Sequence, residues 1–131
     1  MNRPIKFRVW DKLAERMIYP HNDNQQHFII DLNGRFHNLQ NGSGGDDYVI
    51  QQYTGLNDSN DDPIYEGDIL KNHYDVGNNI IGQVLYESDH GGYIFQWKRK
   101  GRGQDYKNLN CDVAFESVIV GNIFENSELL N

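Results

Sequence analysis

The sequence has little that would cross-link or anchor the chain, because its 131 residues include only three prolines and one cysteine. A lone Cys111 cannot form a disulfide within the chain or supply a cysteine-based zinc site. No apolar run approaches the roughly 20 residues of a membrane helix, and the start of the chain leads into Lys6 and Arg8 rather than an apolar signal core. We therefore expect a cytoplasmic protein without membrane contact, held together by packing and hydrogen bonding.

The composition leaves little room for long helices. Asparagine, aspartate and glycine account for 42 residues, as 16 Asn, 13 Asp and 13 Gly, and all three favour turns. Hydrophobic residues make up only 37% of the chain, but 12% of it is aromatic, and large rings bury much surface per residue. At this length we expect one small, polar domain over residues 1–131.

Charge is segregated along the chain, whose formal net charge is −7. Residues 1–20 hold five basic and two acidic side chains, residues 91–107 hold five and one, and residues 21–90 hold two and twelve. The two basic segments suit a polyanion or the acidic stretch of a neighbouring subunit. The alternative is that each is the solvated face of a strand or turn. The strongly basic charge typical of a duplex-binding domain is missing.

Short runs of alternating apolar and polar residues predict β-strands. We expect about eight or nine strands, including residues 4–10, 17–19, 27–32, 35–39, 48–53, 80–86, 93–97 and 117–124. This inventory predicts a mostly β fold with little helix, as a small, mostly antiparallel sheet or partly open barrel. A short helical turn at 126–130 ends the chain.

Two hairpins and one loop are the clearest local predictions. Asn33-Gly34 between two apolar arms indicates a type I′ turn, because both residues tolerate positive φ angles. Residues 89–92 join the second hairpin. Residues 40–47 contain three glycines and no apolar side chain, so burial cannot offset chain entropy there. We interpret this Gly/Asp segment as a mobile surface loop.

Three motifs stand out by their residue order. They are Ile5-Lys6-Phe7-Arg8-Val9-Trp10-Asp11 with Met17 following, residues 52–58 (QYTGLND) leading to 64–69 (IYEGDI), and residues 120–129 (VGNIFENSEL). Together they resemble the YopX family, which is encoded by bacteriophages and by prophages in bacterial chromosomes, and they follow the family order over almost the whole chain. The departures are mild: residues 59–63 replace a more usual Asn-Gly-Lys type of turn, Phe124 replaces Tyr, and Ser127 replaces Pro.

The resemblance implies a small, β-rich cytoplasmic protein of a bacterial host cell, without an established biochemical activity. It further implies a homo-oligomer, with a trimer as the suggested stoichiometry. It supplies no catalytic residues and no cofactor. We expect structural roles for the family motif residues, which are Trp10, Tyr53, Gly55, Tyr65, Glu66, Gly67, Asp68, Gly121 and Asn122.

The Gly67-Asp68 pair has a structural and a functional interpretation. Gly67 supplies a backbone angle that other residues resist, and Asp68 bonds nearby amides as in an Asx turn, similar to strand entry in small SH3-like barrels. The functional interpretation is a carboxylate pair of Glu66 and Asp68 for a cation or for acid/base chemistry, because positions i and i+2 share one strand face. A third ligand is missing, as it is for His73 with Asp75, so we expect no metal site.

The stretch 93–103 makes the one positive functional suggestion. Its aromatic residues run into a basic, glycine-containing end, the combination with which small β-barrels stack bases and track phosphates. The residues of this binding hypothesis are Trp97, Lys98, Arg99, Lys100 and Arg102. The opposing interpretation is a strand with its rings in the core and a solvated basic end. The functional hypothesis is therefore a non-catalytic, oligomeric binding or interaction protein. A nucleic-acid-associated module is the alternative, and an enzyme ranks third.

Overall fold

The computed structural model describes residues 4–20, 27–75, 78–99, 101 and 103–131 of the chain. These residues form antiparallel sheets with one short α-helix, which confirms the predicted mostly β fold. They group into two compact units, Pro4–Gln52 and Tyr53–Asn131, which we call the N-terminal and the C-terminal unit. No helix in the described part of the chain is long and apolar enough to cross a membrane.

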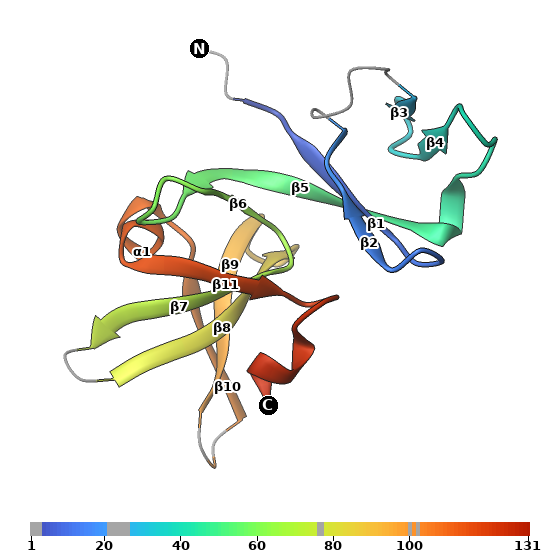
Figure 1. Cartoon of the computed structure of the whole chain (residues 1–131). Helices are drawn as coiled ribbons and strands as arrows, with labels where there is room; N and C mark the ends of the chain where they lie inside the picture. The colour runs from blue at the N-terminus through green and yellow to red at the C-terminus, as the bar shows by residue number, and fades with distance from the viewer. Residues whose placement is uncertain (1–3, 21–26, 76–77, 100, 102) are drawn as a thin grey trace. The chain divides into compact units, whose positions relative to one another are not determined.

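The N-terminal unit is built around its first strand. Its elements are β1 (Phe7–Asp11), β2 (Arg16–Ile18), β3 (Phe28–Ile30), β4 (Phe36–Asn38), the short 3-10 helix η2 (Gly45–Asp47) and the first part of β5 (Tyr48–Asn57). Strand β1 pairs with both β2 and β5 (Figure 1), so that Val9 lies opposite Ile18 and Ile50. Val9, Ile18 and Phe36 form the buried cluster of this unit.

The β3–β4 hairpin forms where the sequence predicts it, but the predicted type I′ turn is wrong. Ile30 pairs with Phe36, and a positive φ occurs at Gly34 (78°) but not at Asn33. The reason is the side chain of Asp31, whose Oδ1 accepts hydrogen bonds from Asn33 N (2.9 Å) and from Arg35 N (3.0 Å). These bonds stabilise a longer turn, in which the glycine takes the single left-handed position.

Residues 40–47 follow a defined path in the structure. Asn38 N donates a hydrogen bond to Ser43 O over 2.8 Å, and Ser43 Oγ lies 2.6 Å from Tyr48 Oη. Gly44 forms a single bridge with His37. The mobility of this segment stays a prediction.

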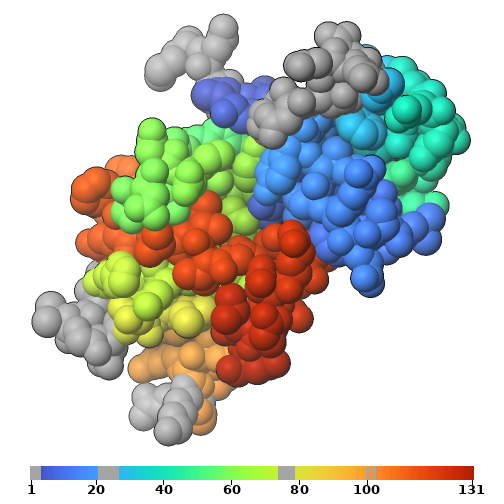
Figure 2. Space-filling view, viewed as in Figure 1, coloured from blue at the N-terminus to red at the C-terminus, as the bar shows by residue number. Residues whose placement is uncertain are grey.

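The C-terminal unit holds a five-stranded antiparallel sheet in the order β10-β9-β8-β7-β11, which curls into a half barrel (Figure 1). Its elements after β5 are β6 (Pro63–Tyr65), β7 (Asp68–Asp75), β8 (Asn78–Glu87), β9 (Gly92–Arg99), β10 (Gly103–Asn108), α1 (Cys111–Phe115), β11 (Ser117–Asn122) and the 3-10 helix η3 (Ser127–Leu130). Leu70, Val84 and Phe95 of the sheet pack with Val113 and Ala114 of α1 in its core. The last residues, red in Figure 2, contribute to the surface of this unit.

The second predicted hairpin is confirmed, since β8 and β9 pair from Gly82↔Trp97 to Glu87↔Gly92. The sequence did not reveal β10 or α1. Strand β10 consists of polar and glycine residues apart from Tyr106, so it shows no apolar alternation, and backbone pairing with β9 defines it instead. Helix α1 has only five residues and begins at an N-cap, Asn110, whose side chain accepts a hydrogen bond from Val113 N.

Candidate functional site

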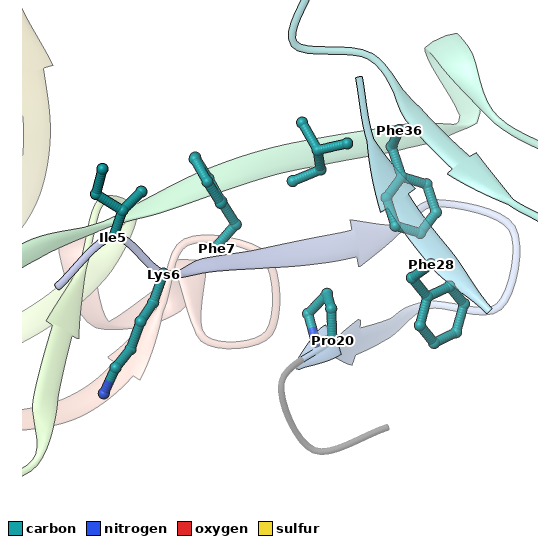
Figure 3. A pocket seen from close by; sticks show the side chains of 7 residues that line it. Ile5, Lys6, Phe7, Pro20, Phe28 and Phe36 are labelled. Carbon is teal, nitrogen blue, oxygen red and sulfur yellow. The ribbon is translucent and has the colours of Figure 1, made fainter. Parts of the chain in front are cut away.

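The N-terminal unit contains a cavity of about 340 Å³ beside the start of β1 (Figure 3). Cavities of a few hundred Å³ with apolar walls are typical of sites that bind small molecules. Its described lining consists of six apolar residues and one lysine: Ile5, Lys6, Phe7, Pro20, Phe28, Ile30 and Phe36.

Two parts of the unit bring these side chains together. Ile5 and Phe7 extend to one side of the chain while Lys6 extends to the other (Figure 3), as extended backbone requires. The β3–β4 hairpin contributes Phe28 and Phe36, whose rings stack with their centroids 5.6 Å apart. Phe36 is 1% exposed and belongs to the core cluster. One wall of the cavity is therefore the core of the unit itself.

The electrostatics of the cavity are simple. Lys6 is the one charged residue of the described lining, and Ile5 beside it is 62% exposed, so the cavity reaches the surface there. Such a site suits an apolar group with a negative charge next to it. Sequence reasoning missed this site, because the same alternation of Ile5 and Phe7 predicts core packing equally well.

The predicted basic and aromatic stretch runs along β9 toward β10. Trp97 is half-buried and packs against the core, with its ring centroid 5.4 Å from that of Phe95. Lys98 and Arg99 are exposed. Successive residues of a strand point to opposite faces, so Lys98 lies on the face opposite Trp97. Lys100 and Arg102 of the hypothesis lie outside the described residues.

Two cationic residues do share the face of Trp97. Arg99 follows it by two positions, and Arg99 Nη1 lies 3.4 Å from Asp105 Oδ2. Lys107 of β10 places its Nζ 6.0 Å from the centroid of the Trp97 ring, which is a cation–π distance. The structure thus places the Lys107 ammonium over a half-buried indole, with Arg99 on the same face of the strand and in contact with Asp105.

The carboxylates of Glu66 and Asp68 have different surroundings. Asp68 is 2% exposed, and its Oδ2 accepts a hydrogen bond from Tyr65 N over 2.8 Å. Glu66 is half-buried. No group of three His, Cys, Asp or Glu side chains that could hold a metal ion occurs in the described parts of the chain. The hydrogen bond from Tyr65 N to the Asp68 carboxylate is the contact that a turn-forming role requires.

Two motif glycines occupy positions that favour glycine. Gly67 has a φ of 87°, and its backbone N–H donates to Val84 O while its C=O accepts from Ile123 N. Gly55 has a φ of 89° and lies at a register shift of β5. Strand β5 therefore continues to Asn57, and its predicted end at residue 53 is wrong, because Gly55 accommodates a bulge within the strand.

The Gly121-Asn122 motif ends β11, and Asn122 shapes the turn that follows. Asn122 Oδ1 accepts hydrogen bonds from Phe124 N (3.0 Å) and Glu125 N (2.9 Å), and Asn122 N donates to Asn126 Oδ1 (3.2 Å). A side chain at Gly121 would collide with Asn126. The motif thus shapes the chain just before η3.

The aromatic motif residues are buried. Trp10 and Tyr53 are each 8% exposed and Tyr65 is 2% exposed, and the rings of Tyr53 and Tyr65 lie 5.8 Å apart. Tyr53 Oη donates a hydrogen bond to Asn57 Oδ1. Burial, together with the negative charge of Asp61, raises the pKa of Tyr53 above its ordinary value. Tyr53 is therefore a poor nucleophile at neutral pH.

Asp58 is a buried carboxylate that the sequence analysis did not single out. It is 6% exposed, and its Oδ1 accepts hydrogen bonds from Asn60 N and Asp62 N, both 2.9 Å long. Its Oδ2 accepts a hydrogen bond from Ile119 N of β11, also over 2.9 Å. The local bonds follow a familiar Asx pattern, whereas the bond to β11 joins residues 61 positions apart and leaves no signal in the sequence.

The described histidines show no metal-ligand arrangement. His37 Nε2 lies 2.8 Å from Asp31 Oδ2 on the β3–β4 hairpin. The pKa of Asp31 is lowered, first by this bond and then by the hydrogen bond from Arg35 N. His73 Nδ1 lies 2.8 Å from Asn79 Oδ1. Each contact joins neighbouring parts of one hairpin.

Comparison with family models identifies the family of this chain. The model described as YopX protein matches residues 6–131, nearly the whole chain. The chain belongs to the YopX family. The resemblance carried by the three sequence motifs is thereby confirmed, and all nine motif residues lie in the matched range.

A solved structure has a similar fold. The crystal structure of protein EF1440 from Enterococcus faecalis is similar to this chain with a TM-score of 0.59 and 23% sequence identity, over 99% of this chain and 100% of that one. At this identity the likeness concerns the fold alone. Comparison with curated proteins finds no match. Function has to be argued from the geometry of the chain.

Proposed function

We propose that this YopX family protein is a non-catalytic, oligomeric binding protein of phage or prophage origin that acts in the cytoplasm of a bacterial host cell. The cavity of about 340 Å³ in the N-terminal unit carries the proposal. Apolar side chains around an open cavity forgo the packing contacts that they would make in a filled core. An occupant restores those contacts.

The occupant that fits is an apolar side chain of a partner protein with an acidic residue beside it. The walls formed by Phe7, Phe28 and Phe36 favour an apolar group, and Lys6 at the lining favours a neighbouring carboxylate. An apolar anchor inserted into a pocket is the usual centre of binding energy in protein interfaces. The oligomeric part of the proposal rests on strand edges, which self-pairing would cover.

An anionic aromatic dye tests the cavity directly. Anilinonaphthalene sulfonate joins apolar rings to one negative charge, so we expect its fluorescence to rise with the wild-type protein. Ile5→Asp should abolish most of this rise, because it removes an apolar wall and repels the sulfonate. Leu13→Asp is the matched control, since Leu13 is 79% exposed and lies outside the cavity lining. Equal dye binding by the two variants would contradict the cavity as the site.

The wild type, Ile5→Asp and Leu13→Asp also test whether a partner protein occupies the cavity. Each is tagged and used as bait in phage-infected bacteria. A captured protein that wild type and Leu13→Asp retain but Ile5→Asp loses supports the proposal. If no captured protein distinguishes the two variants, the proposed occupant is wrong.

A nucleic-acid-associated module is the second candidate function. The observation that favours it is the half-buried Trp97, with Lys107 Nζ over its ring and Arg99 on the same strand face. Labelled single-stranded and duplex oligonucleotides at low salt should then show a rise in fluorescence anisotropy, which is lost when Lys98, Arg99, Lys100 and Arg102 all become Ala. Binding that survives these four substitutions, or no rise at all, rejects the module.

A further inference from the structure

Strand β10 ends the five-stranded sheet (Figure 1), and no strand in the described part of the chain pairs with its outer edge. Gln104, Tyr106 and Asn108 are exposed, Tyr106 by 46%. Strand β10 also carries one acidic and one basic residue, Asp105 and Lys107, on the same face. A bare edge of this length is a template for pairing with another strand.

The direction of the backbone groups along β10 follows from one hydrogen bond. Leu109 N donates to Tyr93 O across the β9–β10 pair over 3.0 Å. Hydrogen-bonded and non-hydrogen-bonded pairs alternate along an antiparallel ladder. The odd-numbered residues of β10 therefore bond toward β9. The even-numbered residues Gln104, Tyr106 and Asn108 direct their N–H and C=O groups to the outer edge.

The N–H of Tyr106 supports this assignment. It donates to Asp105 Oδ1 over 2.9 Å rather than to β9. Asp105 also faces Arg99, at 3.4 Å between Oδ2 and Nη1. Of the outward N–H groups, that of Tyr106 is thus bonded to the Asp105 carboxylate, which also contacts the guanidinium of Arg99.

We propose that β10 is the docking edge for a second copy of this chain, whose own β10 adds antiparallel about a two-fold axis at Tyr106. This inference rests on the self-association in the proposed function, names its interface, and replaces the trimer that the resemblance implies with a two-fold dimer. Tyr106 of each copy exchanges backbone hydrogen bonds with Tyr106 of the other. Asp105 of each copy then lies opposite Lys107 of the other.

The charge pattern of β10 selects this register. Asp105 and Lys107 lie one position to either side of Tyr106, so an antiparallel copy centred there places opposite charges together twice. These are non-hydrogen-bonded pairs, whose side chains approach most closely. An axis at Gln104 or Asn108 also uses outward-facing groups, but it leaves both charges without a charged residue opposite. A two-fold contact is isologous, so the same strand serves both copies.

Pairing exchanges bonds within one copy for bonds between copies. The Tyr106 N–H leaves Asp105 Oδ1 and donates to the other copy's Tyr106 O. The Asp105 carboxylate keeps its contact with Arg99 and accepts from the other copy's Lys107. The Tyr106 N–H consequently keeps a hydrogen-bond acceptor when the second copy docks.

A charge-reversal mixing experiment tests the interface. Sedimentation at micromolar concentrations should give the wild type a mass of twice 15.2 kDa. Asp105→Lys places two lysines opposite each other, and Lys107→Asp places two aspartates opposite each other. Each variant alone should have a dimer dissociation constant raised by about tenfold or more. An equimolar mixture of the two restores both opposite-charge pairs, so dimers should return.

The controls separate folding from docking. Asp89→Lys makes the same charge change at an exposed residue of the β8–β9 turn and should leave the dimer intact, and circular dichroism checks the fold of every variant. Tyr106→Pro removes an outward N–H and should also yield monomers. Three outcomes overturn the β10 interface alone. They are a wild-type oligomer that Asp105→Lys, Lys107→Asp and Tyr106→Pro leave unchanged, a mixture of the two charge variants that stays monomeric, and a wild-type trimer. A wild type that is monomeric throughout overturns the oligomeric part of the proposed function as well.

Discussion

Buried carboxylates in this protein bind backbone amides. Asp58 and Asp68 are 6% and 2% exposed, and each accepts hydrogen bonds from N–H groups of its own turn. A charged group taken out of water needs such donors, because its desolvation is otherwise uncompensated. In the sequence, the same residues are equally compatible with acid/base chemistry. The burial of each carboxylate and the backbone N–H groups that donate to it distinguish a turn-forming role from acid/base chemistry. Both features are visible only in the structure.

Removing the Asp58 carboxylate should destabilise the protein. Three N–H groups, those of Asn60, Asp62 and Ile119, lose their acceptor in Asp58→Ala, which we expect to lower the free energy of unfolding by about 2–4 kcal/mol. Urea denaturation measures the change. Asp89→Ala alters an exposed aspartate and should change the stability by no more than about 0.5 kcal/mol. Equal effects of the two substitutions would show that the buried carboxylate is dispensable.

At the scale of elements, the sequence predicts those strands that bury one face. The apolar alternation of β1, β8 and β9 was sufficient to place them, and the Asn33-Gly34 pair placed the first hairpin. Strand β10 and the longer turn at Asp31 were not predictable in this way. The first is defined by backbone pairing with β9 and the second by a side chain outside the turn dipeptide.

The β8–β9 hairpin depends on a glycine that the sequence motifs do not mark. A Cβ atom at Gly82 would collide with the backbone of Gln96 and the ring of Phe95 on the neighbouring strand. We expect Gly82→Ala to lower the free energy of unfolding by about 1–3 kcal/mol. Gly92→Ala in the same hairpin meets nothing within 4 Å and is the matched control. Thermal unfolding measures the stability of both variants, and similar melting temperatures would contradict the steric argument.

For the whole molecule, we propose that the two units unfold as one domain, as the length of the chain predicts. Strand β5 supports this, because its first residues pair with β1 and its last with β6, so one continuous strand belongs to both units. The charge segregation seen in the sequence also belongs to this scale, and it motivates the proposal that subunits associate.

The two tryptophans test the single-domain proposal, since Trp10 lies in the N-terminal unit and Trp97 in the C-terminal unit. In Trp10→Phe the remaining fluorescence reports on the C-terminal unit, and in Trp97→Phe it reports on the N-terminal unit. Within each variant, we expect the fluorescence and circular dichroism transitions in urea to coincide. Transitions with separate midpoints would mean that the units unfold independently.

The sequence alone determined the family, the strand-rich class and the positions of most turns, because these depend on local preferences and on short-range alternation. The tertiary structure decided where the functional candidates lie. Residues 5–7 and 28–36 line one cavity. Lys98 lies on the strand face opposite Trp97, and Asp105 and Lys107 lie on the edge strand of a sheet. Such placements depend on pairing and packing between residues far apart in the chain, which local composition does not encode.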